Sequence, residues 1–377
     1  MDEITRILDG FTDPTTGSLH GAIFVVIDNS GKTIYERTSG KASFEDGNLI
    51  APQLDSLCWV ASMTKLVTGV AIMQLVEQNL LSLDDDARDY VSELKGIQIL
   101  RDMGPNDNGH LETLQPRLEP VQGKLTIRHP LIFEPGTSWA YGAGIDWAGR
   151  VVECVSNSTL EDYMQENIWS KLGATSTTFH PERRRNTLPD AFEMGYRVSI
   201  GHGSKSVKKG PITLHQPSKD SLGGIGLFST TTDYVKLLAA LLKGGAPILS
   251  QSGLDILFQP HLSEASRLAM PKSLGLQMSR ILGIKSVDDA SQADHCLAGT
   301  INLKDIPGRR KAGTVNWSGL PNLHWWIDPK TGIAATLFTQ LMPPGDAAVT
   351  SLLIELEEAT YRALPNEVTS NSISSRL

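Results

Sequence analysis

The chain has 377 residues, of which 40% are hydrophobic and 20% charged, as expected for a globular protein of one large domain or two smaller ones. Its net charge of −8 argues against nucleic acid or an anionic membrane as the main partner, and no stretch is apolar enough to span a bilayer. The three cysteines, at 58, 154 and 296, lack metal-like spacing, so we expect reduced thiols in an intracellular protein. Residues 1–8 lack the pattern of a secretory signal.

The first elements are a short helix over 4–11 and a β-hairpin. The β-rich runs 20–28 and 32–38 are separated by Asn29-Ser30-Gly31, which is a turn sequence. The stretch 59–76 follows, and after Ser62 nearly all of its residues are apolar or small. This pattern predicts a helix that is buried on all sides.

The middle of the chain alternates helical and irregular stretches. Residues 96–124 are rich in Pro, Gly, Asn and charge, and 180–220 show little periodicity, so both predict long surface loops. The glycine run 223–226 does not match phosphate-binding spacings, which favours close backbone packing against a site. Helices are predicted over 139–155, 162–172 and 234–242.

The C-terminal part predicts three strands, over 311–317, 323–328 and 332–340, and a closing helix over 346–364. Strands therefore occur at both chain ends, with helices between them. We predict an α+β fold with one antiparallel sheet built from both ends, flanked by helices, and a large, mainly helical inserted lobe. The predicted division is 1–75 plus 305–364 for the sheet lobe, 76–304 for the helical lobe and 365–377 for a flexible tail.

Ser62 and Lys65 are the first candidate catalytic residues. They are three apart, so on a helix they share one face and the amine can reach the hydroxyl. A lysine that faces an apolar interior loses solvation of its charged form, and the neutral amine can take the serine proton. The alternative is a helix cap at Ser62 and a surface position for Lys65. The eleven nearly uncharged residues after Lys65 favour the catalytic interpretation.

A third group is needed to move the proton to the leaving group, and Tyr141 is the best candidate. It follows the turn sequence Pro135-Gly136 and precedes Gly142-Ala143-Gly144, whose small residues let a substrate approach. Without Ser62 and Lys65, Tyr141 would be an ordinary tyrosine at the start of a helix.

With these residues the chain resembles the serine β-lactamase-like, penicillin-binding-protein fold, in its class C and family VIII esterase branch. Within that branch it looks most like fungal acyltransferases of the lovastatin type. The resemblance is carried by four motifs: Ala61-Ser62-Met63-Thr64-Lys65, Pro135-Gly136 followed by Tyr141, Gly223-Gly224-Ile225-Gly226-Leu227-Phe228-Ser229-Thr230, and Asn316-Trp317-Ser318-Gly319-Leu320-Pro321-Asn322.

The resemblance implies that Ser62 is acylated while Lys65 and Tyr141 handle protons. It places the oxyanion hole at the backbone N–H groups of Ser62 and Gly319, with Leu320 as the alternative donor to Gly319. We expect no cofactor and no metal, since the acidic run Asp84-Asp85-Asp86 lacks the alternating ligands and the glycine of a calcium loop. The candidate substrate-binding residues are Trp317, Ser318, Gly224 and Ala143; for Trp317, a place in the core of the sheet is the alternative.

The chain departs from true β-lactamases in its recognition residues. Tyr141-Gly142-Ala143 lacks the asparagine of Tyr-x-Asn, and Trp317-Ser318-Gly319 replaces the Lys-Thr-Gly strand element. A literal Lys330-Thr331-Gly332 follows Asp328-Pro329 and predicts a hairpin turn instead. Segment 129–135 is shorter than expected from relatives, because Leu125-Thr126-Ile127-Arg128-His129-Pro130 runs almost directly into Phe133-Glu134-Pro135-Gly136, which should open the acceptor side of the cleft.

We therefore expect an acyltransferase that moves an acyl group from a thioester or ester to a hydroxyl of a small molecule, in fungal secondary metabolism. The expected donor is acyl-CoA or a carrier-protein thioester. A carboxylesterase is the alternative, and a β-lactamase or a catalytically silent binding scaffold is less favoured.

The serine-rich tail 365–377 has little to bury, so it should be flexible and accessible. Its final Ser375-Arg376-Leu377 resembles the Ser-Lys-Leu peroxisomal address. We expect a peroxisomal location through an import receptor, with the cytoplasm as the alternative.

Overall fold

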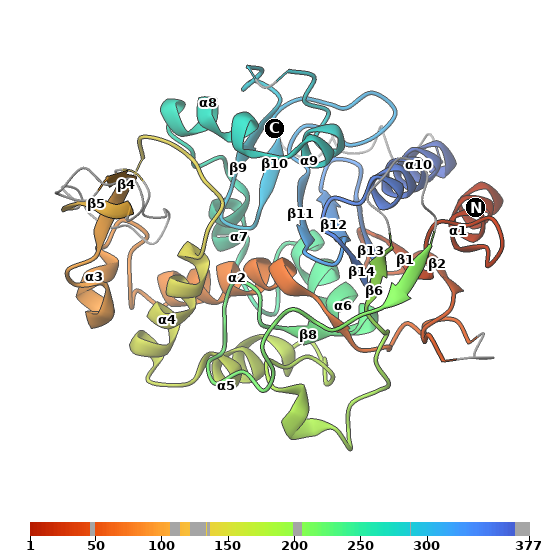
Figure 1. Ribbon diagram of the computed structural model, residues 1–377, viewed down its shortest axis with the longest axis horizontal. Helices are drawn as coiled ribbons and strands as arrows, with labels where there is room; N and C mark the ends of the chain where they lie inside the picture. Colours follow the sequence, from red (N-terminus) through yellow and green to blue (C-terminus); the bar gives the residue numbers. More distant parts are fainter. Residues whose placement is uncertain are drawn as a thin grey trace.

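The computed structural model describes residues 1–45, 50–105, 114–120, 133, 136–198, 206–286 and 288–365. Its centre is a seven-stranded antiparallel sheet of order β2-β1-β13-β12-β11-β10-β9 (Figure 1). Its strands are β1 (Gly21–Asp28), β2 (Thr33–Gly40), β9 (Ala293–His295), β10 (Thr300–Asn302), β11 (Val315–Gly319), β12 (Leu323–Asp328) and β13 (Ile333–Phe338). The predicted sheet from both chain ends is confirmed.

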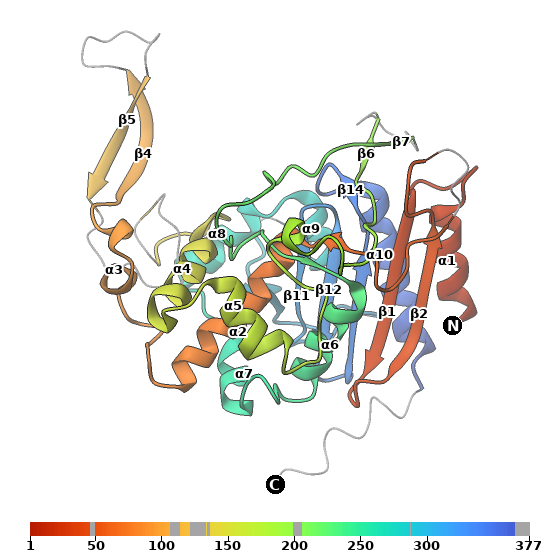
Figure 2. The same ribbon diagram turned by 90° about the horizontal axis from the view of Figure 1, so that it is seen from below.

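Two terminal helices cover one face of this sheet. They are α1 (Asp2–Thr12) and α10 (Ala347–Ala363), which pack side by side against it (Figure 2). Their apolar residues form one cluster with the residues of β1 and β13 that point to this face, among them Phe24 and Leu337. Because side chains alternate along a strand, the neighbouring residues point to the opposite face.

The opposite face packs on the helices of the middle of the chain. Ile23, Val25 and Ile27 point this way and join a large cluster with α2 (Thr64–Glu77) and α6 (Thr231–Leu242). Helix α2 is buried around nearly its whole circumference, as predicted, because α4 (Gly144–Ser156), α5 (Leu160–Met164) and α7 (Gln251–Phe258) also pack on it. The site described below therefore starts from a rigid central helix.

Several sequence predictions for the middle of the chain are corrected. Residues 96–124 contain a hairpin, β4 (Gln98–Pro105) and β5 (Leu114–Pro120), which projects from the body (Figure 2). Pro116 and Pro120 face Met103 and Gln98 in a two-stranded ribbon, where each strand has a free edge that tolerates proline. The helix predicted over 139–155 begins only at Gly144, and 162–172 divides into α5 and a π-helical turn, Gln165–Trp169.

The remaining elements are short. They are β3 (Cys58–Trp59), β6 (Gly195–Arg197), β7 (Val207–Lys209), β8 (Phe228–Ser229), β14 (Leu341–Met342), α3 (Ala87–Tyr90), α8 (Glu264–Ser273), α9 (Leu276–Ile281), and the 3₁₀ turns Ala61–Met63, Ser92–Leu94 and Pro181–Arg184. Strands β6 and β7 lie in the segment 180–220 that was predicted to be a loop.

Lys330-Thr331-Gly332 forms the turn between β12 and β13, as predicted. Gly332 has a φ of +75°, and the Thr331 N–H donates to Asp328 Oδ1. Strands β9 and β10 extend the sheet from within 76–304, and the division into lobes stays a prediction. Residues 366–377 lie outside the described part of the chain. Within that part, no helix is long and apolar enough to cross a membrane.

Candidate active site

Ser62 lies in a tight 3₁₀ turn, Ala61–Met63, that connects β3 to α2. The sequence suggested that Ser62 begins the helix itself, whereas α2 starts two residues later, at Thr64. Ala61 has a φ of +45°, in the left-handed region that residues with a Cβ rarely adopt. Such strain persists where the surrounding structure imposes it, and it is typical of functional sites.

The side chains of Ser62, Lys65 and Tyr141 meet at this turn. Ser62 Oγ lies 2.5 Å from Tyr141 Oη, and Lys65 Nζ lies 3.3 Å from Ser62 Oγ. Lys65 Nζ also lies 4.7 Å from the centre of the Tyr141 ring. The structure thus brings Ser62 within hydrogen-bonding reach of both Lys65 and Tyr141, as nucleophilic catalysis requires.

Tyr141 is held by an aromatic neighbour on the sheet. It lies in the extended segment before α4, and its ring centre is 5.7 Å from that of Trp317 on β11. Trp317 in turn makes an edge contact with His295, with ring centres 5.4 Å apart. Tyr141 is 52% exposed, whereas Trp317 is 6% exposed, so the sheet supplies a fixed surface for a tyrosine that faces solvent.

The end of β11 lies directly against the turn that carries Ser62. A Cβ on Gly319 would lie 2.4 Å from the Val60 carbonyl oxygen, so only glycine fits there. This closeness sets the end of β11 against the turn that carries Ser62, and an oxyanion hole built from the Ser62 and Gly319 N–H groups requires these two segments to be adjacent. Leu320, the alternative donor, follows the end of β11 and lines the cavity described next.

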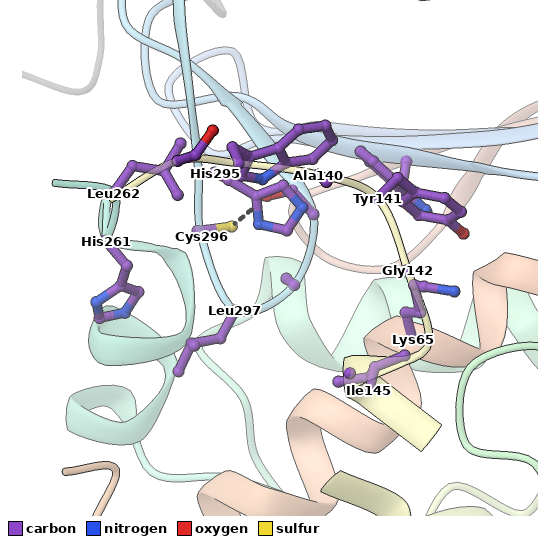
Figure 3. A pocket seen from close by; sticks show the side chains of 16 residues that line it. Lys65, Ala140, Tyr141, Gly142, Ile145, His261, Leu262, His295, Cys296 and Leu297 are labelled. Carbon is purple, nitrogen blue, oxygen red and sulfur yellow. Dashed lines mark hydrogen bonds between the residues drawn. The ribbon is translucent and has the colours of Figure 1, made fainter. Parts of the chain in front are cut away.

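Two cavities meet at these residues. The larger, about 480 Å³, is lined by Ser62, Gly319, Leu320, Ser318 and the residues 273–278 around the start of α9. The smaller, about 140 Å³, lies behind Tyr141 and Lys65, and Figure 3 shows His261 and Leu262 on its far wall. Trp139, Tyr141 and Trp317 line both cavities and form the partition between them.

Two titratable groups in the cavity walls, His324 and Cys296, are kept neutral by burial. Burial, with a smaller contribution from the Arg310 charge, lowers the pKa of His324 in the larger cavity to about 3. Burial raises the pKa of the Cys296 thiol in the smaller cavity to about 12. Both groups line their cavities without charge near neutral pH.

The glycine run was predicted to pack its backbone closely against a site, and it packs on α2 beside Lys65. Thr68 Oγ1 donates to the Gly223 carbonyl at 2.7 Å, and Lys65 Nζ donates to the Gly224 carbonyl at 2.8 Å. Gly224 therefore contacts the lysine rather than lining either cavity. Ala143 is the N-cap residue of α4 and also lines neither cavity, although its neighbours Gly142 and Gly144 do.

Several residues of the site escaped the sequence analysis. Gln340 braces the strand before Ser62, because its side chain accepts from the Trp59 N–H and donates to the Trp59 carbonyl. The segment 273–278 forms one wall of the larger cavity. Neither has a recognisable motif, since both act through contacts with distant parts of the chain. Within the described ranges, no group of three or more His, Cys, Asp or Glu side chains could hold a metal ion.

Together, the fold and the serine, lysine and tyrosine beside the end of β11 define the class of serine acyl-transferring enzymes with a β-lactamase or transpeptidase-like fold. The family model described as Beta-lactamase matches residues 5–359, so the chain belongs to the beta-lactamase family. Within it, the chain is an acyl-serine enzyme of the acyltransferase and esterase group.

The chain is similar over nearly its whole length to fungal enzymes. It is 29% identical to lovastatin esterase of Penicillium rubens, covering 92% of this chain and 94% of the relative. It is 28% identical to monacolin J acid methylbutanoyltransferase of Aspergillus terreus, covering 90% and 91%. Unliganded simvastatin synthase from Aspergillus terreus superposes with a TM-score of 0.84 at 27% identity, over 97% of this chain and 100% of that one.

Proposed function

We propose that this enzyme accepts an acyl group from a thioester or ester on Ser62 and transfers it to a hydroxyl of a small molecule. The observation that carries the proposal is the placement of Ser62 Oγ within reach of both Lys65 Nζ and Tyr141 Oη, at a cavity of about 480 Å³. A cavity of this size, with mostly apolar walls, suits a small organic substrate.

The chemistry follows from these contacts. Lys65, with Tyr141, takes the hydroxyl proton as Ser62 Oγ bonds to the acyl carbon, and the N–H groups of Ser62 and Gly319 stabilise the oxyanion. The bond to the leaving group breaks, and Tyr141 returns the proton to the departing sulfur or oxygen. An incoming hydroxyl then loses its proton to the same pair and bonds to the acyl carbon. The bond between the acyl carbon and Ser62 Oγ breaks, and the pair returns the proton to Ser62 Oγ.

Substrates of the relatives indicate what to try first. The names of two related enzymes specify monacolin J acid and ML-236A carboxylate as acceptors of a methylbutanoyl group. We therefore propose short branched acyl donors and hydroxyl-bearing acceptors of the monacolin kind. Acyl-CoA and a carrier-protein thioester are both proposed as donors, because either presents the same thioester carbon to Ser62.

Intact mass spectrometry tests the proposal directly. The protein is incubated with a panel of acyl thioesters, then with candidate acceptors. A mass increase equal to the acyl group, absent in Ser62→Ala and discharged by an acceptor to give the ester product, supports transfer. Two results would indicate a binding scaffold instead. Either the wild-type protein reacts with neither thioesters nor a fluorophosphonate probe, or the Ser62→Ala variant reacts to the same extent as the wild type.

Hydrolysis is the second candidate function, because one relative is named lovastatin esterase. The two functions differ in whether water or an alcohol discharges the acyl-enzyme. Product analysis with and without acceptor separates them: an esterase releases free acid at an undiminished rate when acceptor is added. β-Lactam hydrolysis is the least favoured activity, since Trp317 and Ala143 replace the two groups that would hold a β-lactam.

We also propose a peroxisomal location, with the cytoplasm as the alternative, on the sequence Ser375-Arg376-Leu377 alone. The test is a fluorescent protein that carries residues 365–377 at its C-terminus in a fungal cell. Punctate signal that depends on Leu377 supports the peroxisome, and diffuse signal that is unchanged by deleting Leu377 returns the protein to the cytoplasm.

A further inference from the structure

A carboxylate outside the predicted catalytic set is linked to the lysine through a single glycine. Asp146 lies in the first turn of α4, and its Oδ1 accepts the Gly224 N–H at 2.7 Å. The carbonyl of the same glycine accepts from Lys65 Nζ at 2.8 Å. Asp146 on α4 is therefore joined to Lys65 on α2 by two short hydrogen bonds that share one residue.

The fit around Gly224 leaves little freedom. A Cβ on Gly224 would lie 2.7 Å and 2.9 Å from the two carboxylate oxygens of Asp146 and 2.9 Å from Ile145 Cγ2. The neighbouring Gly223 carbonyl is fixed by Thr68 at 2.7 Å. The Asp146 carboxylate thus packs closely against Gly224 as well as binding it. A larger residue at position 224 would collide with this carboxylate, which accounts for the glycine.

The orientation of the lysine amine depends on where the Gly224 carbonyl points. A neutral amine that acts as a base has two N–H donors and one lone pair. Donation of one N–H to the Gly224 carbonyl directs the rest of the amine toward Ser62 Oγ, which lies 3.3 Å away. A base must be in place before its proton affinity matters, so a small rotation of this carbonyl would misdirect the lone pair.

From these contacts we infer that Asp146 is a positioning residue for catalysis: by accepting the Gly224 N–H, it holds the Gly224 carbonyl where Lys65 needs it. The inference rests on the proposed role of Lys65 as the base for Ser62. It assigns a task to the hydrogen-bonding ability of Asp146 rather than to its charge. The competing explanation is structural, namely that an acidic residue in the first turn of α4 only stabilises that helix.

Two substitutions at this position separate these explanations. Asp146→Asn keeps an oxygen that accepts the Gly224 N–H, whereas Asp146→Ala removes it. Glu153→Gln is the matched control, because Glu153 lies on the same helix and its side chain binds Arg150 and the Leu160 N–H, away from the site. All four proteins are compared for kcat and KM with a p-nitrophenyl ester, for thermal unfolding, and for hydrogen exchange of the peptide that contains Gly224.

We expect Asp146→Ala to lower kcat by roughly ten- to a hundredfold with little change in KM. The variant only misplaces the amine of Lys65, so its effect on the rate should be smaller than the effect of deleting that amine. Asp146→Asn should keep at least about a third of the wild-type kcat, and Glu153→Gln should match wild type. Exchange of the Gly224 amide should accelerate in Asp146→Ala alone. Exchange is read without any turnover, so it tests the bond even if no ester is cleaved.

Three results would overturn the inference. In the first, Asp146→Ala retains the wild-type kcat. In the second, Asp146→Asn loses as much activity as Asp146→Ala, which would make the charge the operative property. In the third, the activity of Asp146→Ala falls only in proportion to the decrease in the fraction of folded protein. If none of the tested donors acylates Ser62 of the wild-type enzyme, the proposed function is refuted instead. The exchange measurement still decides whether Asp146 fixes Gly224.

Discussion

Gly319 and Val60 approach so closely that a Cβ at position 319 would lie 2.4 Å from the Val60 carbonyl oxygen. Real Cβ atoms essentially never come this near to an oxygen, so Gly319→Ala must push the end of β11 away from the turn of Ser62. We expect acylation of Ser62 to fall by about a hundredfold or more, because the proposed oxyanion donors would separate. Rates of fluorophosphonate labelling measure this loss.

Gly10→Ala is the control for Gly319→Ala. Gly10 lies in helix α1, where an added Cβ would meet nothing within 4 Å, so this alanine should leave labelling unchanged. It should also raise the free energy of unfolding by about 0.5–1 kcal/mol, since alanine is the better helix former. Wild-type labelling by Gly319→Ala would show that the backbone of Gly319 does not bind the oxyanion.

Removal of the Lys65 amine or the Tyr141 hydroxyl should greatly slow the acylation of Ser62 while the fold persists. Lys65→Ala and Tyr141→Phe are each expected to lower the acylation rate by about a hundred- to ten-thousandfold, because each removes a proton-transfer group. Stopped-flow measurement of the acylation burst and circular dichroism check the two parts of the prediction. Turnover near the wild-type rate in both variants would exclude these roles.

Trp317 is expected to shape substrate preference as well as the core, because it lines both cavities and contacts Tyr141. Trp317→Phe should change the ratio of rates for short and long acyl donors. Trp325 faces Trp317 across β11 and β12 and is fully buried in the core cluster, so Trp325→Phe is the matched control that should lower only stability. Equal donor ratios in wild type and Trp317→Phe would leave Trp317 as a core residue alone.

The sequence predicted those parts of the site that depend on local spacing. Ser62 and Lys65 are three residues apart, so their contact follows from helical geometry once a helix is assigned. Five of the seven sheet strands were predictable for a similar reason, because apolar runs between turn residues such as Gly332 identify them. The three-residue strands β9 and β10 were missed, since each is too short to show a pattern. The hairpin β4–β5 was missed because its prolines are typical of loops.

The remaining parts depend on contacts between distant segments. Tyr141 meets Ser62 across 79 positions, and Asp146 meets Gly224 across 78. Tyr141 could be proposed because it lies between the turn sequence Pro135-Gly136 and the small residues 142–144, and because Ser62 and Lys65 call for a third proton-transfer group. No spacing rule relates Asp146 to Gly224, and an aspartate in a first helical turn is ordinary in itself. Its relation to the site became visible only when the helix and the glycine loop were placed together.

The final prediction concerns acid stability, which two buried histidines should limit. Burial lowers the pKa of His324 to about 3 and that of His20 to about 4, below the usual 6.5. Below pH 6.5 the unfolded chain therefore binds protons that the folded chain refuses, so their contribution is intact above pH 6.5 and is lost as pH falls toward 3–4. Each histidine should therefore lower the free energy of unfolding by about 2 kcal/mol at pH 5.0 relative to pH 7.5.

Urea unfolding at both pH values measures this difference in the free energy of unfolding, and His324→Gln should remove the part that His324 contributes. His215→Gln, which replaces an exposed histidine, is the control and should leave the difference as in wild type. An equal pH dependence in wild type and His324→Gln would show that His324 is not kept neutral by its burial.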